Sequence, residues 1–164
     1  MVSFFKKKVT ATELAINLLQ YVTCSDVSSS LDQLQLGTYR ERVNDELRYL
    51  LVFVVDYAIS KNLGNNSPEK NAILDAYYFN LQEMTKKGVF CADFYKNLFN
   101  DRLPTYTNAV NTPHENGVPY TVGKKFAEFC VYHPDIRLTI AGSSIFSGQF
   151  VSISEIFKTW EVIL

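Results

Sequence analysis

The chain has 164 residues, of which 47% are hydrophobic and 20% are charged, and its 16 basic and 17 acidic residues leave a formal net charge of −1. A chain of this length holds enough apolar material for one ordinary core, whereas two cores would each be marginal, so we expect residues 1–164 to form a single helical domain. The balanced charge provides no general attraction for a phosphate backbone, which argues against a nucleic-acid partner.

The first predicted element is an amphipathic helix over residues 9–24, in which apolar side chains recur every three or four positions. Three consecutive lysines at 6–8 precede it, and we interpret them as the solvated start of this helix, because three lysines supply only about 3 kcal/mol of attraction to lipid. Glu13 and Asn17 interrupt the apolar pattern, which argues against a secretory signal.

A long second helix is predicted from Thr38 to Leu63, ended by Gly64. It contains an apolar run, Leu50 to Ile59, that carries a single carboxylate, Asp56. This run is about half the roughly 20 residues that a membrane span needs. On a helical wheel Asp56 faces away from the main apolar stripe, yet its neighbours are apolar, so we expect another helix, the C-terminal segment or a second subunit to cover it.

The third predicted helix has the clearest boundaries in the chain. Ser67 is a suitable N-cap, Pro68 suits the first helical position, and Gly88 closes the helix. Asp75 falls at the edge of the apolar stripe of this helix, beside polar residues, which indicates a solvated flank.

A fourth helix is predicted over about 91–103, where Pro104 is expected to end or kink it. Arg102 lies in the middle of its apolar stripe, with Tyr95 about two turns before it. Tyr106 would extend the stripe if the helix continued through the proline.

The last third of the chain is predicted to contain a surface loop over 111–119 and a helix over 121–133 that Pro134 stops. Alternating apolar residues favour a short β-hairpin within 136–150, and a capping-box pattern at 152–155 predicts a final apolar helix. Together these elements predict an all-α bundle of five or six helices.

No catalytic or metal-binding signature occurs in the sequence: it contains no glycine-rich phosphate loop, G-x-S-x-G, H-E-x-x-H or C-x-x-C pattern. The two histidines are interpreted structurally, His114 as a loop residue and His133 as a helix-end residue. We therefore expect no catalytic residues, no metal site and no cofactor. The question of enzymatic activity stays open, and the missing signatures favour a protein that is not an enzyme.

The three cysteines, Cys24, Cys91 and Cys130, are odd in number and far apart. This pattern predicts reduced, buried side chains rather than a disulfide framework, and hence a cytoplasmic protein.

Arg102 is the most anomalous charge, because an interior-facing arginine keeps its charge and needs a carboxylate or several carbonyls. We expect it to pair with Asp56 or Asp75. The tyrosines expected to complete this buried polar cluster are Tyr77, Tyr78, Tyr95 and Tyr106. The cluster is interpreted as an ion pair that fixes the register of the helices, or else as a pocket in which Arg102 receives a ligand carboxylate or phosphate.

The leading functional prediction is a non-catalytic helical bundle that acts as a protein-interaction or self-association module, most simply a homodimer. Its 10 tyrosines and 12 phenylalanines are consistent with an aromatic interface, and the candidate surfaces are the Asp56 side of the second helix and the C-terminal helix. The alternative is a small-molecule binding protein or enzyme with an anionic-ligand pocket around Arg102, Asp56 and the tyrosines. A third interpretation is a peripheral membrane protein that uses Phe4, Phe5 and the following lysines.

Overall fold

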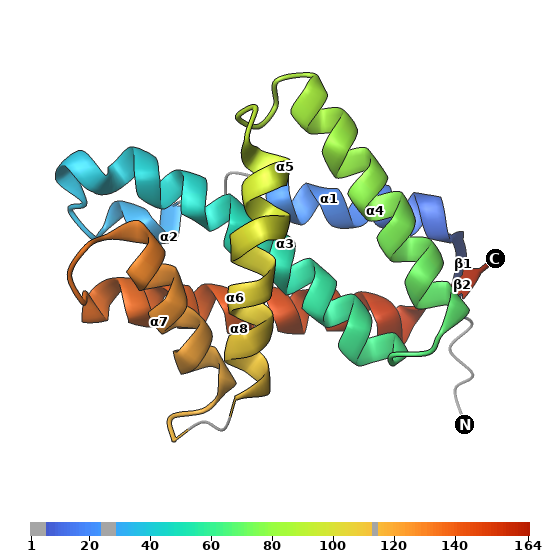
Figure 1. The fold of residues 1–164 in the computed structure, drawn as a ribbon. Helices are drawn as coiled ribbons and strands as arrows, with labels where there is room; N and C mark the ends of the chain where they lie inside the picture. The colour runs from blue at the N-terminus through green and yellow to red at the C-terminus, as the bar shows by residue number, and fades with distance from the viewer. Residues whose placement is uncertain (1–5, 24–28, 113–114) are drawn as a thin grey trace.

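The expected all-α helical bundle is confirmed by a computed structural model, which describes residues 6–23, 29–112 and 115–164. The described residues form six helices of nine residues or more, two helices of four residues, and one short two-stranded sheet (Figure 1). The elements are β1 (Lys7–Thr10), α1 (Ala11–Thr23), α2 (Ser29–Asp32), the 3-10 turn η2 (Gly37–Tyr39), α3 (Arg40–Leu63), α4 (Pro68–Lys86), α5 (Phe94–Asn97), the π-helical segment η3 (Leu98–Arg102), α6 (Leu103–Asn111), α7 (Val118–Cys130), α8 (Ile136–Thr159) and β2 (Trp160–Ile163).

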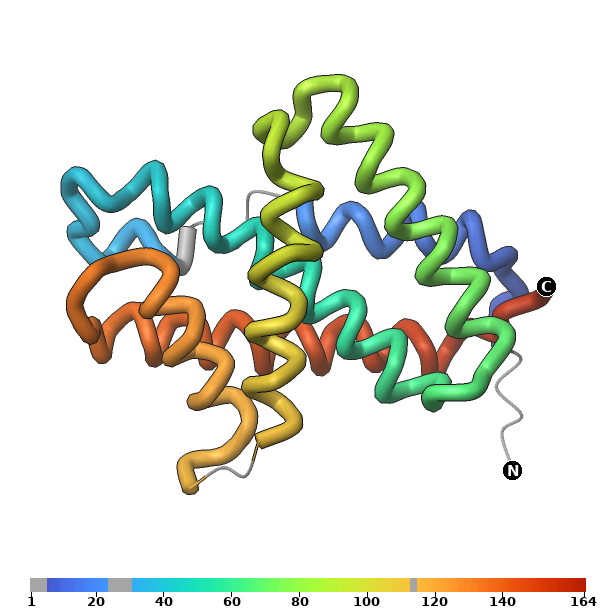
Figure 2. The backbone as a smooth tube through the Cα atoms, viewed as in Figure 1, coloured from blue at the N-terminus to red at the C-terminus, as the bar shows by residue number. Residues whose placement is uncertain are grey.

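The core is built around α3, which packs against α1, α4, α7 and α8 (Figure 2). Every residue from Leu50 to Val55 is buried, on all sides of this helix. A helix that is apolar all round is stable in water only when neighbours cover its whole circumference. The apolar run seen in the sequence is therefore the centre of the bundle.

Helix α4 begins as predicted. The Ser67 Oγ accepts a hydrogen bond from the Lys70 backbone N–H at 3.2 Å, and Pro68 occupies the first helical position. Beyond the last turn, Gly88 has φ 77°, a conformation that a residue without a Cβ adopts readily.

Two of the three lysines expected to start the first helix, Lys7 and Lys8, lie in a strand instead. β1 pairs in parallel with β2, with Lys7 opposite Trp160, so the two ends of the described chain lie together. Helix α1 starts only after Thr10, whose Oγ1 accepts from the Glu13 N–H at 3.2 Å while the Glu13 carboxylate accepts from the Thr10 N–H at 2.9 Å. This reciprocal pair is a capping box, which fixes the start of α1.

The predicted β-hairpin within 136–150 is wrong, because these residues form the first part of α8. The Asp135 carboxylate caps this helix by accepting from the N–H groups of Arg137 at 2.8 Å and Leu138 at 3.3 Å. The predicted cap at 152–155 lies inside the same helix, where the Ser152 hydroxyl donates to the Gly148 carbonyl at 2.9 Å. One long helix therefore replaces the predicted hairpin and short helix.

Helices α7 and α8 approach each other closely because each helix has a glycine where the two are in contact. A Cβ at Gly123 would lie 2.2 Å from the Thr139 carbonyl oxygen, and one at Gly142 would lie 2.7 Å from the Phe126 ring. Neither position has room for a side chain without moving the helices apart. α7 also ends at Cys130, three residues earlier than predicted.

The chain continues as a helix through Pro104, which was expected to end or kink it. α5, η3 and α6 follow one another from Phe94 to Asn111, and the π-helical segment lies directly before the proline. Proline has no N–H to donate and its ring crowds the carbonyl four residues earlier, so a wider turn at this point accommodates it. Tyr106 beyond the proline is buried, as the extended stripe predicted.

Candidate functional site

Arg102 forms a buried ion pair with Glu46, which links η3 to the first half of α3. Its Nε donates to the Glu46 Oε2 at 3.0 Å, its Nη2 donates to the Glu46 Oε1, and its Nη1 donates to the Asp101 Oδ2 at 2.6 Å. The side chains of Arg102 and Glu46 are 18% and 6% exposed. The prediction that Arg102 pairs with Asp56 or Asp75 is therefore wrong, because a carboxylate nearer to it on α3 takes this place.

Aromatic rings enclose the Arg102 guanidinium. Its centre lies 5.1 Å from the centroid of Tyr49 and 4.3 Å from that of Phe129. Tyr49 in turn stacks on Phe94 at 4.4 Å, and burial raises the pKa of Tyr49 to about 12. The hydrogen bonds to Glu46 raise the pKa of Arg102. The arginine is thus held in one orientation by two carboxylates and two ring faces.

A pocket of about 390 Å³ opens beside this ion pair. Its charged lining residues are Glu41, Arg42, Asp45, Glu46, Arg48 and Arg102, so basic and acidic groups balance. Arg42 donates through its Nε to the Phe129 carbonyl oxygen at 2.8 Å, and Arg102 is bound to its carboxylates. A ligand anion would have to compete with these partners for Arg42 and Arg102, whereas the third arginine of the lining, Arg48, lies 5.7 Å from the centroid of the Phe90 ring.

Asp56 lies at a second polar contact, between α3 and α4. The Tyr78 hydroxyl donates to the Asp56 carboxylate, and α4 supplies the cover that the sequence left undecided among three candidates. Burial raises the pKa of Asp56 above its usual range, and burial together with the nearby carboxylate raises the pKa of Tyr78. The Asp56 side of α3 is therefore turned into the bundle rather than toward a partner.

The remaining predicted residues are distributed between these two places. Tyr106 packs at 5.7 Å against the same Phe129 ring that Arg102 contacts, and Tyr95 packs at 4.8 Å against Phe99, whose ring also contacts Tyr78. Tyr77 neighbours Tyr78, with ring centroids 5.4 Å apart. Asp75 is exposed on α4 and belongs to neither place.

The structure thus divides the predicted cluster into two. We call them the Arg102 cluster (Glu46, Asp101, Arg102, Tyr106) and the Asp56 cluster (Asp56, Tyr77, Tyr78, Tyr95). Glu46 and Asp56 are separated by about 15 Å along α3 at the helical rise of 1.5 Å per residue. Among the described residues, the hydroxyls of Tyr77 and Tyr106 are buried without a hydrogen-bond partner, one in each cluster.

Glu46 is the residue that the sequence analysis missed. It lies one turn before Leu50 and two turns before Phe53, both of them buried. Positions four and seven residues apart share one face of a helix, so this carboxylate shares a face with buried side chains. The same wheel that singled out Asp56 therefore contained the signal for Glu46.

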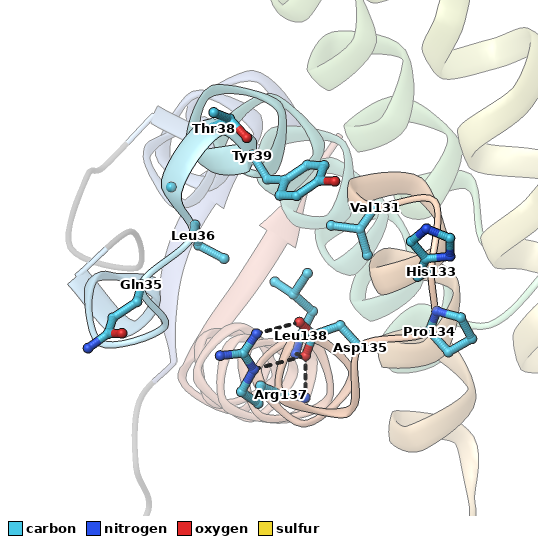
Figure 3. A pocket seen from close by; sticks show the side chains of 11 residues that line it. Gln35, Leu36, Thr38, Tyr39, Val131, His133, Pro134, Asp135, Arg137 and Leu138 are labelled. Atoms are coloured by element: carbon cyan, nitrogen blue, oxygen red, sulfur yellow. Dashed lines mark hydrogen bonds and ion pairs between the residues drawn. The ribbon is translucent and has the colours of Figure 1, made fainter.

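A second pocket of about 390 Å³ lies where η2 meets the connection between α7 and α8 (Figure 3). Tyr39 lines it on one side, and His133 on the other side follows the end of α7. Asp135 and Arg137 also line the pocket, but they bind each other, with Nη2 to Oδ2 at 2.8 Å. The two charged groups of this pocket are thus bound to each other, and Asp135 also caps α8.

The outward face of α8 is unusual because it carries no charge over most of its length. Its exposed residues include Ile140, Ser144, Gly148 and Val151, which recur at four-, four- and three-residue spacing and which we call the α8 stripe. Ile140 is 56% exposed and Val151 is 57% exposed. No charged residue occurs in the sequence between Arg137 and Glu155.

The cysteine prediction holds only in part. Cys130 is buried, and burial raises the pKa of its thiol, but Cys91 is exposed at the edge of the Arg102 pocket. Cys24, like His114, Phe4 and Phe5, lies outside the described residues. The expectation of a buried side chain is therefore wrong for Cys91.

No helix in the described ranges combines the length and apolar character needed to cross a membrane. Within the same ranges, no three His, Cys, Asp or Glu side chains are grouped as a metal site requires. Comparisons with protein-family models, curated proteins and solved structures gave no match to this chain.

Proposed function

We propose that this chain is a non-catalytic helical bundle that associates with a second copy of itself, and that the α8 stripe is the contact surface. The observation that carries the proposal is the exposed, uncharged face of a 24-residue helix, which presents the apolar side chains of Ile140 and Val151 to solvent. Cores of protein interfaces are depleted in charged residues, whereas the solvated face of a helix is normally rich in them.

Helix α4 provides the internal reference for this argument. Its outward face exposes Asp75, Gln82 and Lys86 beside Phe79. That face has the composition expected of a helix surface in water, and the α8 stripe has a different composition in the same molecule. The difference supports α8 as the surface that a second copy covers.

The test is the oligomeric state across a concentration series, measured by size-exclusion chromatography with light scattering. We expect a dimer for the natural sequence and a monomer for Val151→Lys, which places a charge in the α8 stripe. Ile16→Lys is the matched control, because Ile16 is 50% exposed on α1, away from the stripe. A natural chain that stays monomeric at every concentration, or two lysine variants that behave alike, would contradict the proposal.

A second candidate function is supported by the pocket beside Arg102, which could hold a small carboxylate or phosphate. A thermal-shift panel of such anions tests it, and we expect stabilisation only if a ligand displaces Asp101 or Glu46 from the arginine. This is the weaker candidate, because Arg102 already donates hydrogen bonds to Glu46 and Asp101.

We further propose a cytoplasmic location and no stable membrane association. The location is supported by the free thiols of Cys91 and Cys130. Sedimentation with anionic vesicles tests the membrane alternative, and a pellet containing the protein would revive it.

A further inference from the structure

Gly148 is the position on α8 that the fold itself does not explain. Glycine inside a helix is destabilising relative to alanine, so it needs a reason. Gly123 and Gly142 have one, because a Cβ at either would collide with the facing helix. A Cβ at Gly148 would meet nothing within 4 Å among the described residues, and φ there is not positive.

The missing side chains at Gly123 and Gly142 make room for a facing helix, and the free space at Gly148 offers the same room to a helix from outside. Where α7 and α8 cross, small residues let the two helix backbones approach closely. At Gly148 the same arrangement is present on the outward side, with Ser144 one turn before it and no described residue covering either. This favours a partner helix that approaches α8 at the Ser144–Gly148 segment.

The charges that flank the α8 stripe indicate which helix fits. Arg137 precedes the stripe and Glu155 follows it, and on a helical wheel both fall within about 20° of Ser144. Both are exposed, with side-chain exposures of 61% and 58%, and each forms an ion pair within the chain, Arg137 with Asp135 at 2.8 Å and Glu155 with Lys158 at 2.6 Å. Ion pairs between exposed side chains contribute only about 0–1 kcal/mol, so both side chains can exchange partners. The stripe therefore begins with an arginine and ends with a glutamate.

This pattern is complementary to itself in one orientation only. If a second α8 runs antiparallel, Arg137 faces Glu155 of the partner subunit at each end. The same register places Ser144 opposite Gly148 of the partner subunit, because both pairs are centred on position 146. It also brings Ile140 opposite Val151 of the partner subunit within one residue. In a parallel arrangement, arginine would face arginine and glutamate would face glutamate.

We propose that two copies of this chain pair antiparallel through α8, about a two-fold axis at position 146, with close backbone contact at Ser144 and Gly148 and an Arg137–Glu155 ion pair at each end. This inference rests on the proposed function and specifies its geometry. A two-fold axis uses the same patch on both copies, so each side-chain pair occurs twice.

Charge reversal tests the orientation. Arg137→Glu and Glu155→Arg each place like charges opposite one another at both ends, so we expect each to weaken the dimer at least about tenfold. The double variant restores both pairs and is expected to recover the affinity of the natural chain. Each single change also breaks one exposed ion pair within the chain, that of Arg137 with Asp135 or that of Glu155 with Lys158. Each nevertheless places a favourable charge at its helix end, acid near the N-terminus and base near the C-terminus, so the fold should persist, as far-UV circular dichroism would verify.

Gly148→Leu tests the close contact without disturbing the monomer. Space is free around this position, and leucine favours helix more than glycine, so we expect an equal or higher melting temperature for the monomer. The bulkier side chain separates the two helices, so we expect the dimer to be lost. Gly148→Ala should weaken it to an intermediate degree.

Disulfide cross-linking in a Cys91→Ser background reads the register directly. We expect a mixture of Ser144→Cys and Gly148→Cys chains to cross-link with each other rather than with their own kind. Preferential like-with-like cross-links, or no rescue in the double charge variant, would overturn the antiparallel register while a dimer sensitive to Val151→Lys kept the proposed function intact. A natural chain that is monomeric, or a dimer indifferent to both Val151→Lys and Gly148→Leu, would overturn both.

Discussion

The Arg102 cluster and the Asp56 cluster each contain a carboxylate of α3, but the two carboxylates have different hydrogen-bond donors. Glu46 receives two hydrogen bonds from a guanidinium that stays charged, whereas Asp56 receives its hydrogen bonds from the neutral hydroxyls of Tyr78 and Ser60. Burial raises the pKa of Asp56. The same chemical group on α3 therefore has its charge compensated at one position and disfavoured at the other.

We therefore expect the two clusters to respond oppositely to the loss of a charge. Removing the arginine leaves Glu46 buried without its counter-ion, but removing the charge of Asp56 relieves a desolvation cost. Three sets of variants test this contrast.

The largest effect is expected for Arg102→Met. It leaves the Glu46 carboxylate buried without its partner, which typically costs about 3–5 kcal/mol. Chemical denaturation measures this loss. The double variant Arg102→Met with Glu46→Leu should regain most of it, because an apolar pair of similar volume replaces the ion pair. A melting temperature unchanged by Arg102→Met alone, with a ligand-induced shift that disappears, would instead favour the anionic-ligand pocket.

Asp56→Asn is expected to stabilise the protein near neutral pH by on the order of 1 kcal/mol. The reason is that asparagine removes a buried charge that its hydrogen bonds compensate only in part. Because the pKa of Asp56 is higher in the folded than in the unfolded state, the folded protein binds this proton more tightly. Stability is lost as the pH rises from the pKa of the unfolded state through that of the folded state.

The asparagine variant escapes this loss, so its advantage should shrink toward acidic pH, where the natural carboxyl group is protonated in both states. Denaturation midpoints measured from neutral to acidic pH test this sign. An advantage that grows on acidification would show that the Asp56 charge is stabilising.

The smallest effects are expected for Tyr77→Phe and Tyr106→Phe, one in each cluster. Each removes a buried hydroxyl that has no partner among the described residues, so stability should stay equal or rise by about 1 kcal/mol or less. Tyr78→Phe is the matched control, because its hydroxyl donates to Asp56 and its removal should destabilise. Equal losses for all three variants would mean that every hydroxyl is satisfied.

Local signals in the sequence were sufficient for elements whose boundaries are set by local chemistry. Ser67, Pro68 and Gly88 mark the ends of α4 because capping and positive φ depend on a few adjacent residues. The burial of Tyr106 also followed from helical spacing alone. These features need no knowledge of what packs against them.

The sequence was insufficient where a distant element decided the outcome. Ile136 to Ile140 alternates as a strand would, but this segment is the start of α8, in which Leu138 and Thr139 are buried, Ile136 and Ile140 are exposed, and Asp135 caps the helix. The lysines at 6–8 resemble a helix start, but β2 from the far end of the chain pairs with Lys7 and Lys8 in a strand. The partner of Arg102 depended on how η3 crosses α3, which periodicity does not encode.

The pairing of β1 with β2 also bears on the order in which the molecule assembles. Lys7 and Trp160 are separated by nearly the whole chain, so their contact closes the longest loop in the fold. Closing such a loop costs chain entropy that only the packed helices between the two strands can offset. We therefore expect the strand pair to form after the helical core during folding. We also expect it to be the first contact to open when the native state fluctuates.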